Sequence, residues 1–245
     1  MSRVDEIAIS YERLYAEHAR APFGSAVPYP HVLIDDLFDD RDLDTIRSEF
    51  PEDGDSIWQR NHHSHSRKQA LADKSLMGPV SQAYFDAVAS SAFLRALEEI
   101  TGIPDLEPDP DLAGGGYHLT LPGGYLDIHA DFPHHHRLPL RRRLNLITYL
   151  GRDWAEGDGG MFEMWNQEAG ETARRVEPVF NRSLIFLVSP DTYHGHPVPL
   201  RRHRRPSLAV FYYTRDSSME APTSQPATDY LENRNQPSPG GPANG

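Results

Sequence analysis

The sequence contains no cysteine among its 245 residues. This absence excludes disulfide bonds, thiolate zinc sites and cysteine nucleophiles, and it gives no support to an oxidising compartment. Positive charge is also scarce, because 24 Lys and Arg stand against 36 Asp and Glu, for a net charge of −12. Nucleic acids attract basic surfaces, so we do not expect a general nucleic-acid binder.

Long apolar runs are missing as well. The longest run, LIFLV at 184–188, is much shorter than the roughly 20 residues of a membrane-spanning helix. The opening MSRVDEIAIS has no apolar segment of the kind found in signal peptides. We therefore expect a soluble, cytoplasmic protein with no membrane partner, built as one domain with decoration.

The first 111 residues carry mainly helical signals. Apolar residues at helical spacing predict helices over 3–19, over 39–50 and, as two separate patterns, over 79–100. HVLID, at 31–35, predicts a short strand, whereas the polar, histidine-bearing stretch 52–72 predicts a loop. We expect residues 1–111 to form a support region of helices and a strand that packs on the core.

The character of the chain changes after Gly114. Short runs rich in β-branched and aromatic residues follow one another between turn signals: YHLTL, YLDIHADF, LNLITYL, MFEMW, SLIFLVS and SLAVFYYT. Strands at this spacing predict an all-β sandwich or barrel. We place this β core at residues 112–215. Residues 216–245 have little to bury, and we expect them to form a mobile tail.

LDIHADF carries the first candidate site. His129 and Asp131 are two residues apart, so on a strand they would project from the same face. They could form a surface ion pair, or a buried histidine hydrogen-bonded to a carboxylate. They could also supply two ligands of the 2-His-1-carboxylate triad that holds non-haem Fe(II) and leaves open positions for substrates. The triad requires a third ligand, a histidine well downstream.

His194 is the candidate for that ligand, because it follows the predicted strand SLIFLVS; His196 has the same strand parity and is the rival. The other histidines fall in two predicted loops. They are His62, His63 and His65 in the first loop, and His134, His135 and His136 in the second. For both groups a solvated surface or incidental metal affinity is the simpler interpretation.

The last predicted strand, RPSLAVFYYT, carries a candidate anion site. Arg205 and Ser207 share one face of it, and together they can bind a carboxylate, the guanidinium through two hydrogen bonds and the hydroxyl through one. LNLITYL places Asn145 and Tyr149 on one face, and Tyr149 could be a further donor or simply a core tyrosine. Arg201, Arg202 and Arg204 are expected in a solvated basic turn.

These segments, taken in order, resemble a known family. HADF, RRLNLITYLGRDWAEGDGGMFEMW, YHGHP and RPSLAVFYYT are similar to motifs of the Fe(II)/2-oxoglutarate-dependent dioxygenases, in the prolyl-hydroxylase-like branch, over about residues 112–214. The resemblance implies a mainly β fold with N-terminal helices, whose core is a double-stranded β-helix of the jelly-roll or cupin-like kind. It assigns His129, Asp131 and His194 to Fe(II). It assigns Arg205, Ser207 and Tyr149 to the distal carboxylate of 2-oxoglutarate.

The implied activity is oxidation of a small molecule, by hydroxylation or a related C–H oxidation. It would be coupled to O2 and to decarboxylation of 2-oxoglutarate to succinate and CO2. Two alternatives stay open, a hydroxylase acting on prolines or other residues of a peptide or protein, and a non-catalytic β-sandwich that binds a metal or carboxylate. Plausible substrate-pocket residues are His118, Arg143, Asn145 and Trp165.

The carboxylate at position 131 also predicts the outcome of the reaction. Related halogenases have a small residue at the matching position, which leaves room for chloride, whereas Asp131 would occupy it. We therefore expect a product that has gained one oxygen atom or lost two hydrogens. Mass spectrometry of a substrate turned over with labelled O2 in chloride-containing buffer checks this, and a chlorinated product would contradict it.

Overall fold

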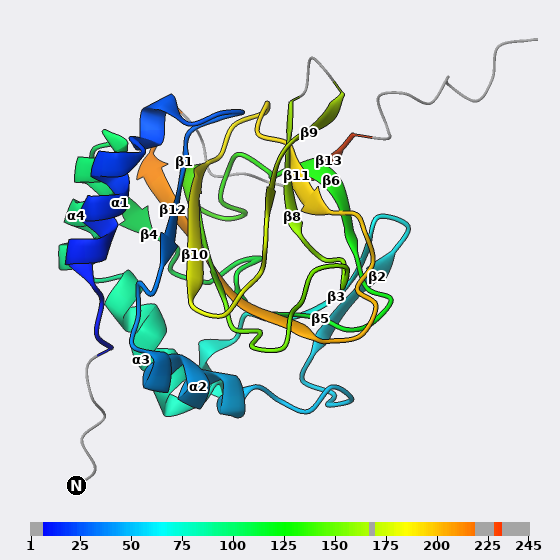
Figure 1. Ribbon diagram of the computed structural model, residues 1–245. Coiled ribbons are helices and arrows are strands. Elements are labelled where there is room, and N and C mark those ends of the chain that lie inside the picture. The colour runs from blue at the N-terminus through cyan, green and yellow to red at the C-terminus, as the bar shows by residue number, and fades with distance from the viewer. Residues whose placement is uncertain (1–6, 167–169, 219–227, 232–245) are drawn as a thin grey trace, which may run out of the picture.

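The computed structural model describes residues 7–166, 170–218 and 228–231. Its strands form one curled sheet in which all paired neighbours are antiparallel (Figure 1). The helices are α1 (Tyr11–Arg20), α2 (Asp40–Glu49), α3 (Pro79–Val88) and α4 (Ser91–Thr101), with short 3-10 turns η1 (Phe23–Ser25) and η2 (Lys74–Leu76). The strands are β1 (His31–Asp35), β2 (Gln59–His63), β3 (Ser66–Leu71), β4 (Glu107–Pro108), β5 (Gly116–Thr120), β6 (Leu126–Ala130), β7 (Leu140–Tyr149), β8 (Phe162–Asn166), β9 (Glu171–Val176), β10 (Arg182–Leu187), β11 (His194–His196), β12 (Arg205–Arg215) and β13 (Asp229–Tyr230).

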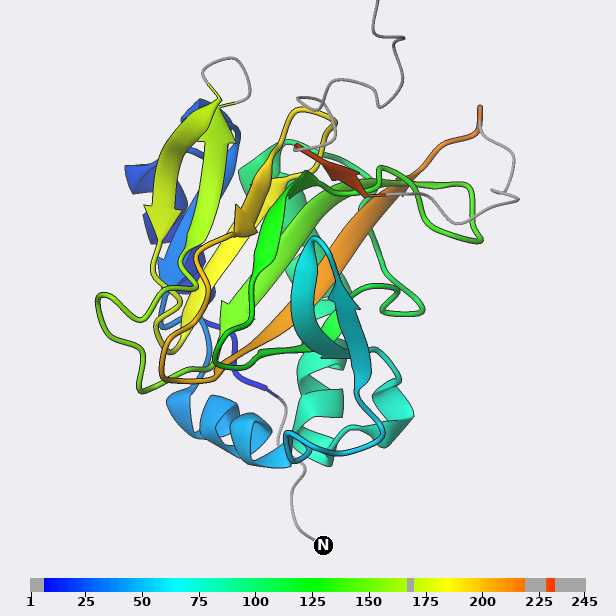
Figure 2. The ribbon, with the colours of Figure 1, turned by 90° about the vertical axis from the view of Figure 1, so that its right-hand side faces the viewer.

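The sheet is rolled so that its two halves face each other (Figure 2). Its strand order is β1-β10-β7-β12-β5-β3-β6-β11-β8-β9, which places β10 and β8 far apart along the hydrogen-bonded path. Even so, the rings of Phe186 on β10 and Phe162 on β8 lie 5.4 Å apart. This closure produces a double-stranded β-helix flanked by helices, and it confirms the predicted fold class.

The two faces of strand β12 have different surroundings. Leu208, Val210 and Tyr212 alternate along it and pack into the main hydrophobic core with side chains from the helices. The residues of the opposite face, among them Ser207 and Ala209, line an internal cavity instead. Successive side chains of a strand point to opposite faces, so the helices stabilise the outer face while the inner face is left for a ligand.

The N-terminal helices largely follow their sequence signals. Asp39 caps α2, which ends just before Pro51, and Gly102 ends α4 with a left-handed φ of 70°. Helix α1 is shorter than predicted, because Ser10 caps it and Ile9 bridges to Phe38 in extended conformation. The predicted helix start at 3–6 lies outside the described residues.

The predicted loop over 52–72 is wrong, because this stretch contains the hairpin β2–β3. Strand β3 pairs with β5, and so it belongs to the wall of the β-helix. Its inward side chains include Ser66 and Lys68, which face the polar cavity rather than an apolar core. A strand of this kind lacks the alternation of apolar and polar residues by which strands are predicted.

The predicted division of the chain also needs correction at two places. Strands β1 and β3, from the region expected only to support the core, are members of the same sheet. In the expected mobile tail, Asp229 and Tyr230 form β13, which pairs with Ala130 and His129 of β6. Most of the remaining tail lies outside the described residues. No helix in the described part of the chain is long and apolar enough to cross a bilayer.

The junction of α2 and α3 predicts a measurable contribution to stability. Glu49, at the end of α2, accepts hydrogen bonds from the backbone N–H groups of Val80 and Ser81 at 3.0 and 2.8 Å, and so caps α3 from outside. Glu49→Ala should lower the free energy of unfolding by about 1–3 kcal/mol, because α3 loses two bonds to a carboxylate. Urea denaturation measures this. Glu52→Ala, at an exposed position, is the control, and an equal loss in both variants would contradict the capping role.

Candidate metal and co-substrate site

Three side chains predicted as metal ligands meet at one point. His129 on β6 and His194 on β11 are cross-strand partners, and Asp131 lies just past the end of β6. The carboxylate reaches both rings, with Asp131 Oδ1 at 3.5 Å from His129 Nε2 and Oδ2 at 3.6 Å from His194 Nε2. One donor atom from each residue lies within 4.8 Å of the others. His196, the rival candidate, is not part of this group.

The backbone sets the proton position on both imidazoles. His129 Nδ1 lies 2.8 Å from the carbonyl oxygen of Asp127, and His194 Nδ1 lies 2.9 Å from that of Thr192. A carbonyl only accepts, so each Nδ1 carries the proton and donates it. Each Nε2 is then left with a lone pair directed at the site, which is the arrangement that metal-binding histidines need.

The ionisation states suit a cation as well. Burial lowers the pKa of His194 to about 4, and the neighbouring His129 acts in the same direction, so this ring is neutral at physiological pH. Burial alone would raise the pKa of Asp131, but its bond to His129 and the nearby His194 and Arg142 hold that pKa well below its usual range. The neutral His194 imidazole, the His129 imidazole and the Asp131 carboxylate form a donor set that fits Fe(II).

Two residues of β7 contact the Oδ2 atom of the Asp131 carboxylate. Asn145 Nδ2 donates to Asp131 Oδ2 at 2.5 Å, and Arg142 Nη1 lies 3.4 Å from the same oxygen. The Arg142 guanidinium is buried between the rings of Phe132 and Phe211, with centroids at 3.8 and 3.7 Å. These contacts leave Asp131 Oδ1 turned toward His129.

Arg142, which the sequence did not indicate, lines the cavity, whereas the predicted pocket residue Arg143 does not. Strict alternation from Asn145 would put Arg143 on the inner face. The pairing of β7 with β12 shifts register between Tyr212 and Tyr213, and this bulge places Arg142 inward. Arg143 instead lies 3.5 Å from Thr214 Oγ1 and does not line the cavity. Because a bulge adds one residue to a strand, the side chains beyond it point to the opposite face from the one that strict alternation predicts.

The predicted pocket residues divide into two groups. His118 and Asn145 line the cavity, whereas Trp165 does not. A register shift in the pairing of β8 with β9 lies between Met164 and Trp165. Trp165 packs instead against the small apolar cluster of Ile128, Ala130 and Tyr193, and its indole donates to Glu163 at 3.0 Å.

The predicted carboxylate anchor lies at one end of the cavity. Arg205 is 7% exposed, and its Nη2 is 3.4 Å from the hydroxyl oxygen of Tyr149. Burial raises the pKa of Tyr149, which keeps its phenol protonated and able to donate. Ser207 is the cross-strand partner of Tyr149. Arg204 points outward and pairs with Asp53 at 3.0 Å, as expected for a solvated arginine.

The cavity between these groups measures about 320 Å³ and contains the metal-ligand candidates and Arg205 together. Its walls include His118, Thr120 and Ser207 from the strands, with Phe132 and Phe211 near Arg142. Part of its cover comes from β13, where Tyr230 stacks on His65 at 4.3 Å and lies 5.6 Å from the His129 ring. His65 lies 3.1 Å from Asp127, so it is not a free surface group.

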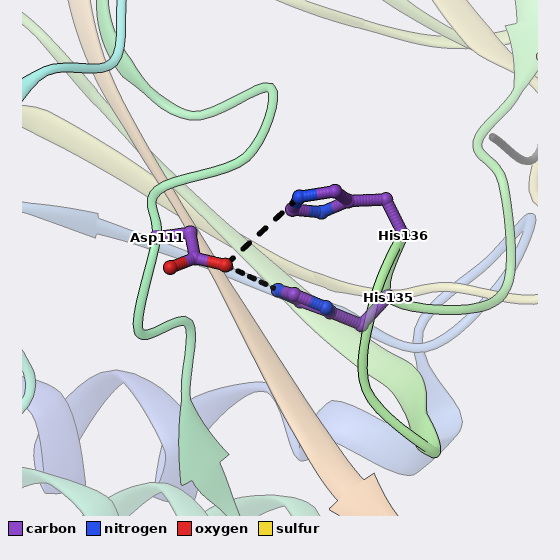
Figure 3. A group of neighbouring side chains, drawn as sticks. All are labelled: Asp111, His135 and His136. Atoms are coloured by element: carbon purple, nitrogen blue, oxygen red, sulfur yellow. Dashed lines mark ion pairs between the residues drawn. The ribbon is translucent and has the colours of Figure 1, made fainter. Parts of the chain in front are cut away.

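A second group of potential ligands lies outside the cavity, at Asp111, His135 and His136 (Figure 3). The prediction of a solvated loop is wrong for His135, which is fully buried. Its Nδ1 accepts from the backbone N–H groups of Arg137 and Leu138 at 3.1 and 3.2 Å. The proton must then be on Nε2, which faces Asp111 at 3.4 Å. A ring whose Nε2 carries the proton is not oriented as a metal ligand, and this Nε2 has no hydrogen-bond partner among the described residues.

Solved structures share this architecture. A Pseudomonas putida prolyl-4-hydroxylase matches with a TM-score of 0.58 at 18% identity, over 84% of this chain and 99% of that one. HygX from Streptomyces hygroscopicus, with nickel and 2-oxoglutarate bound, matches with a TM-score of 0.53 at 14% identity, over 84% and 88%. A Trichoplax adhaerens prolyl hydroxylase, in complex with a hypoxia inducible factor oxygen degradation domain peptide fragment, gives 0.59 at 12%, over 83% and 90%.

Residues 115–213 match the family model of the 2OG-Fe(II) oxygenase superfamily. The chain therefore contains a 2OG-Fe(II) oxygenase domain over this segment. The protein is therefore an Fe(II)- and 2-oxoglutarate-dependent dioxygenase, and the non-catalytic alternative is set aside. The matched segment contains the three candidate metal ligands and Arg205. The residues that would bind the metal and the co-substrate carboxylate therefore lie within the part of the chain that matches the family.

The support behind Asp131 predicts a loss of metal affinity. Asn145→Ala in this oxygenase removes the donor that holds Asp131 Oδ2, so the carboxylate loses its fixed orientation. Metal affinity should fall by about 10- to 100-fold, as for other partners of ligating groups. Competition with a fluorescent chelator for Mn(II) measures it. Arg143→Ala, whose side chain faces away, is the control, and unchanged affinity in Asn145→Ala would refute the role.

Proposed function

We propose that the enzyme oxidises a C–H bond of a small molecule, with His129, Asp131 and His194 as the iron ligands. The observation that carries this proposal is that one cavity is lined both by a 2-His-1-carboxylate group and, at one end, by the buried guanidinium of Arg205. A dicarboxylate co-substrate needs such an arrangement, one end at the metal and the other at a cation.

The protein side chains bind and orient the reactants in this proposal. Arg205, Tyr149 and Ser207 bind the distal carboxylate of 2-oxoglutarate, the guanidinium by charge and the two hydroxyls as donors. Asn145 and Arg142 keep Asp131 in place. When bound, Fe(II) with 2-oxoglutarate and O2 supplies the oxidising power, and the cavity wall excludes bulk water.

The cavity favours a small substrate. Its volume of about 320 Å³ must hold 2-oxoglutarate as well. The β2–β3 hairpin, through Gln59 and Ser66, and the segment at Thr228 and Tyr230 supply part of its lining. A substrate that enters between these elements must be compact, and ligand pockets of this size suit small molecules.

A second candidate function is hydroxylation of proline or another residue in a peptide. It is favoured by two of the structural neighbours, a prolyl-4-hydroxylase and a prolyl hydroxylase with a peptide bound. A peptide would have to displace the segment at Thr228 and Tyr230, or thread past it, to reach His129. Turnover of a proline-containing peptide by the enzyme would favour this alternative.

The test is co-substrate turnover. Purified enzyme with Fe(II), O2 and 2-oxoglutarate should release succinate, and a substrate found in a pool of small metabolites should stimulate that release. His194→Ala should lose Mn(II) binding and succinate release, because it removes one of three ligands. His196→Ala, in the neighbouring inward position, should retain Mn(II) binding. Metal binding that survives in His194→Ala and is lost in His196→Ala would overturn the ligand assignment.

A further inference from the structure

Lys68 is a cation in the cavity that the proposed chemistry has not used. It lies on β3 with its side chain at the cavity wall, among the inward-facing residues Ser66 and Ala70. Among the side chains that the structure describes, its ammonium has no hydrogen-bond or ion-pair partner. A cation in such a place is costly unless an anion joins it, so its presence indicates a negatively charged ligand.

The strand pairing places Lys68 at the Arg205 end. β3 pairs with β5 through Gln69 and Leu119, and the next position along this register brings Lys68 beside Thr120. Thr120 is in turn the cross-strand partner of Arg205 on β12. Lys68 and Arg205 therefore flank Thr120 from its two sides, in one row across three adjacent strands.

Other polar atoms around this row also lack partners among the described residues. They are Ser66 Oγ, His196 Nδ1 and Arg205 Nε, and all three residues line the cavity. Ser66 lies two residues from Lys68 on the same face of β3, and Ser66 and His196 are both cross-strand neighbours of Leu126. Buried polar atoms are normally satisfied, and a cluster of unsatisfied ones marks the place of a polar ligand.

The charge of Lys68 is retained at this position. Burial lowers its pKa to about 8; the charge of Asp131 opposes this shift, and the charge of Arg205 adds to it to a smaller extent. An amine with that pKa is still mostly protonated at neutral pH. Arg142 is a further cation of the cavity, but it is paired with Asp131 and packed between two phenylalanine rings. Unlike Lys68, it therefore already has an anionic partner.

We propose that Lys68 is a second counter-ion for the distal carboxylate of 2-oxoglutarate, which it holds from the side opposite Arg205. Arg205 leans toward Tyr149 on β7, while Lys68 approaches from β3, so the carboxylate is bound between two cations. The inference rests on the proposed binding of 2-oxoglutarate at the Arg205 end. It makes Lys68 a positioning residue for the co-substrate rather than for the oxidised substrate.

The experiment measures binding rather than turnover. Calorimetry with Ni(II)-loaded enzyme compares 2-oxoglutarate with 2-oxopentanoate, which has the same keto-acid end and no distal carboxylate. Lys68→Met should weaken binding of 2-oxoglutarate by about 10-fold or more, the usual cost of losing a charged partner. Its affinity for 2-oxopentanoate should be unchanged. Lys68→Arg should restore much of the affinity, and Lys74→Met, at a residue paired with Asp86 outside the cavity, is the control.

Each outcome decides the proposal. Unchanged affinity of Lys68→Met for 2-oxoglutarate overturns it, and an equal loss for both ligands shows that Lys68 acts elsewhere. The double variant Lys68→Met, Arg205→Met should bind 2-oxoglutarate no better than 2-oxopentanoate. If wild-type enzyme binds 2-oxoglutarate tightly but oxidises no small molecule, only the proposed function fails. A wild-type enzyme that does not bind 2-oxoglutarate contradicts both.

Discussion

The pairing of β6 with β11 is the constraint on which the site depends. It sets His194 opposite His129, with Asp131 just beyond, so that donors 65 residues apart in the chain meet at one point. A slip of one residue would turn the imidazoles to the other face of the sheet. The backbone carbonyls of Asp127 and Thr192 then fix each ring, and so the same two strands supply both the ligands and their orientation.

The polar cavity is tolerated because the rest of the sheet is strongly apolar. The outer faces of β7, β10 and β12 pack with the helices into one large core, which stabilises the strands irrespective of what their inner faces contain. The inner faces can then hold charged groups, provided these have partners. Arg142 has Asp131 and two phenylalanine rings, whereas Lys68 and Arg205 share an end of the cavity whose anion is 2-oxoglutarate in our proposal.

Segments remote from the family core complete the cavity. The β2–β3 hairpin contributes Lys68 and Ser66, and β13 contributes Tyr230, although neither segment lies within the matched residues 115–213. The matched residues thus include the candidate metal ligands and Arg205, whereas the outer elements add further side chains to the cavity lining. The choice of substrate is expected to depend in part on these outer elements, because Tyr230 of β13 lines the cavity beside the His129 ring.

The sequence by itself determined the ligand candidates, the anchor strand and the fold class. His129, Asp131 and Ser207 have fixed spacings along strands, and a strand's alternation of faces is a local property. Local patterns could not place Arg142, because a bulge formed by pairing with β12 reversed the facing of β7. Nor could they place Lys68 or β13: a strand that faces a polar cavity has no apolar period, and a two-residue strand exists only through its partner. Those features are decided by contacts between distant segments, which only the tertiary structure brings together.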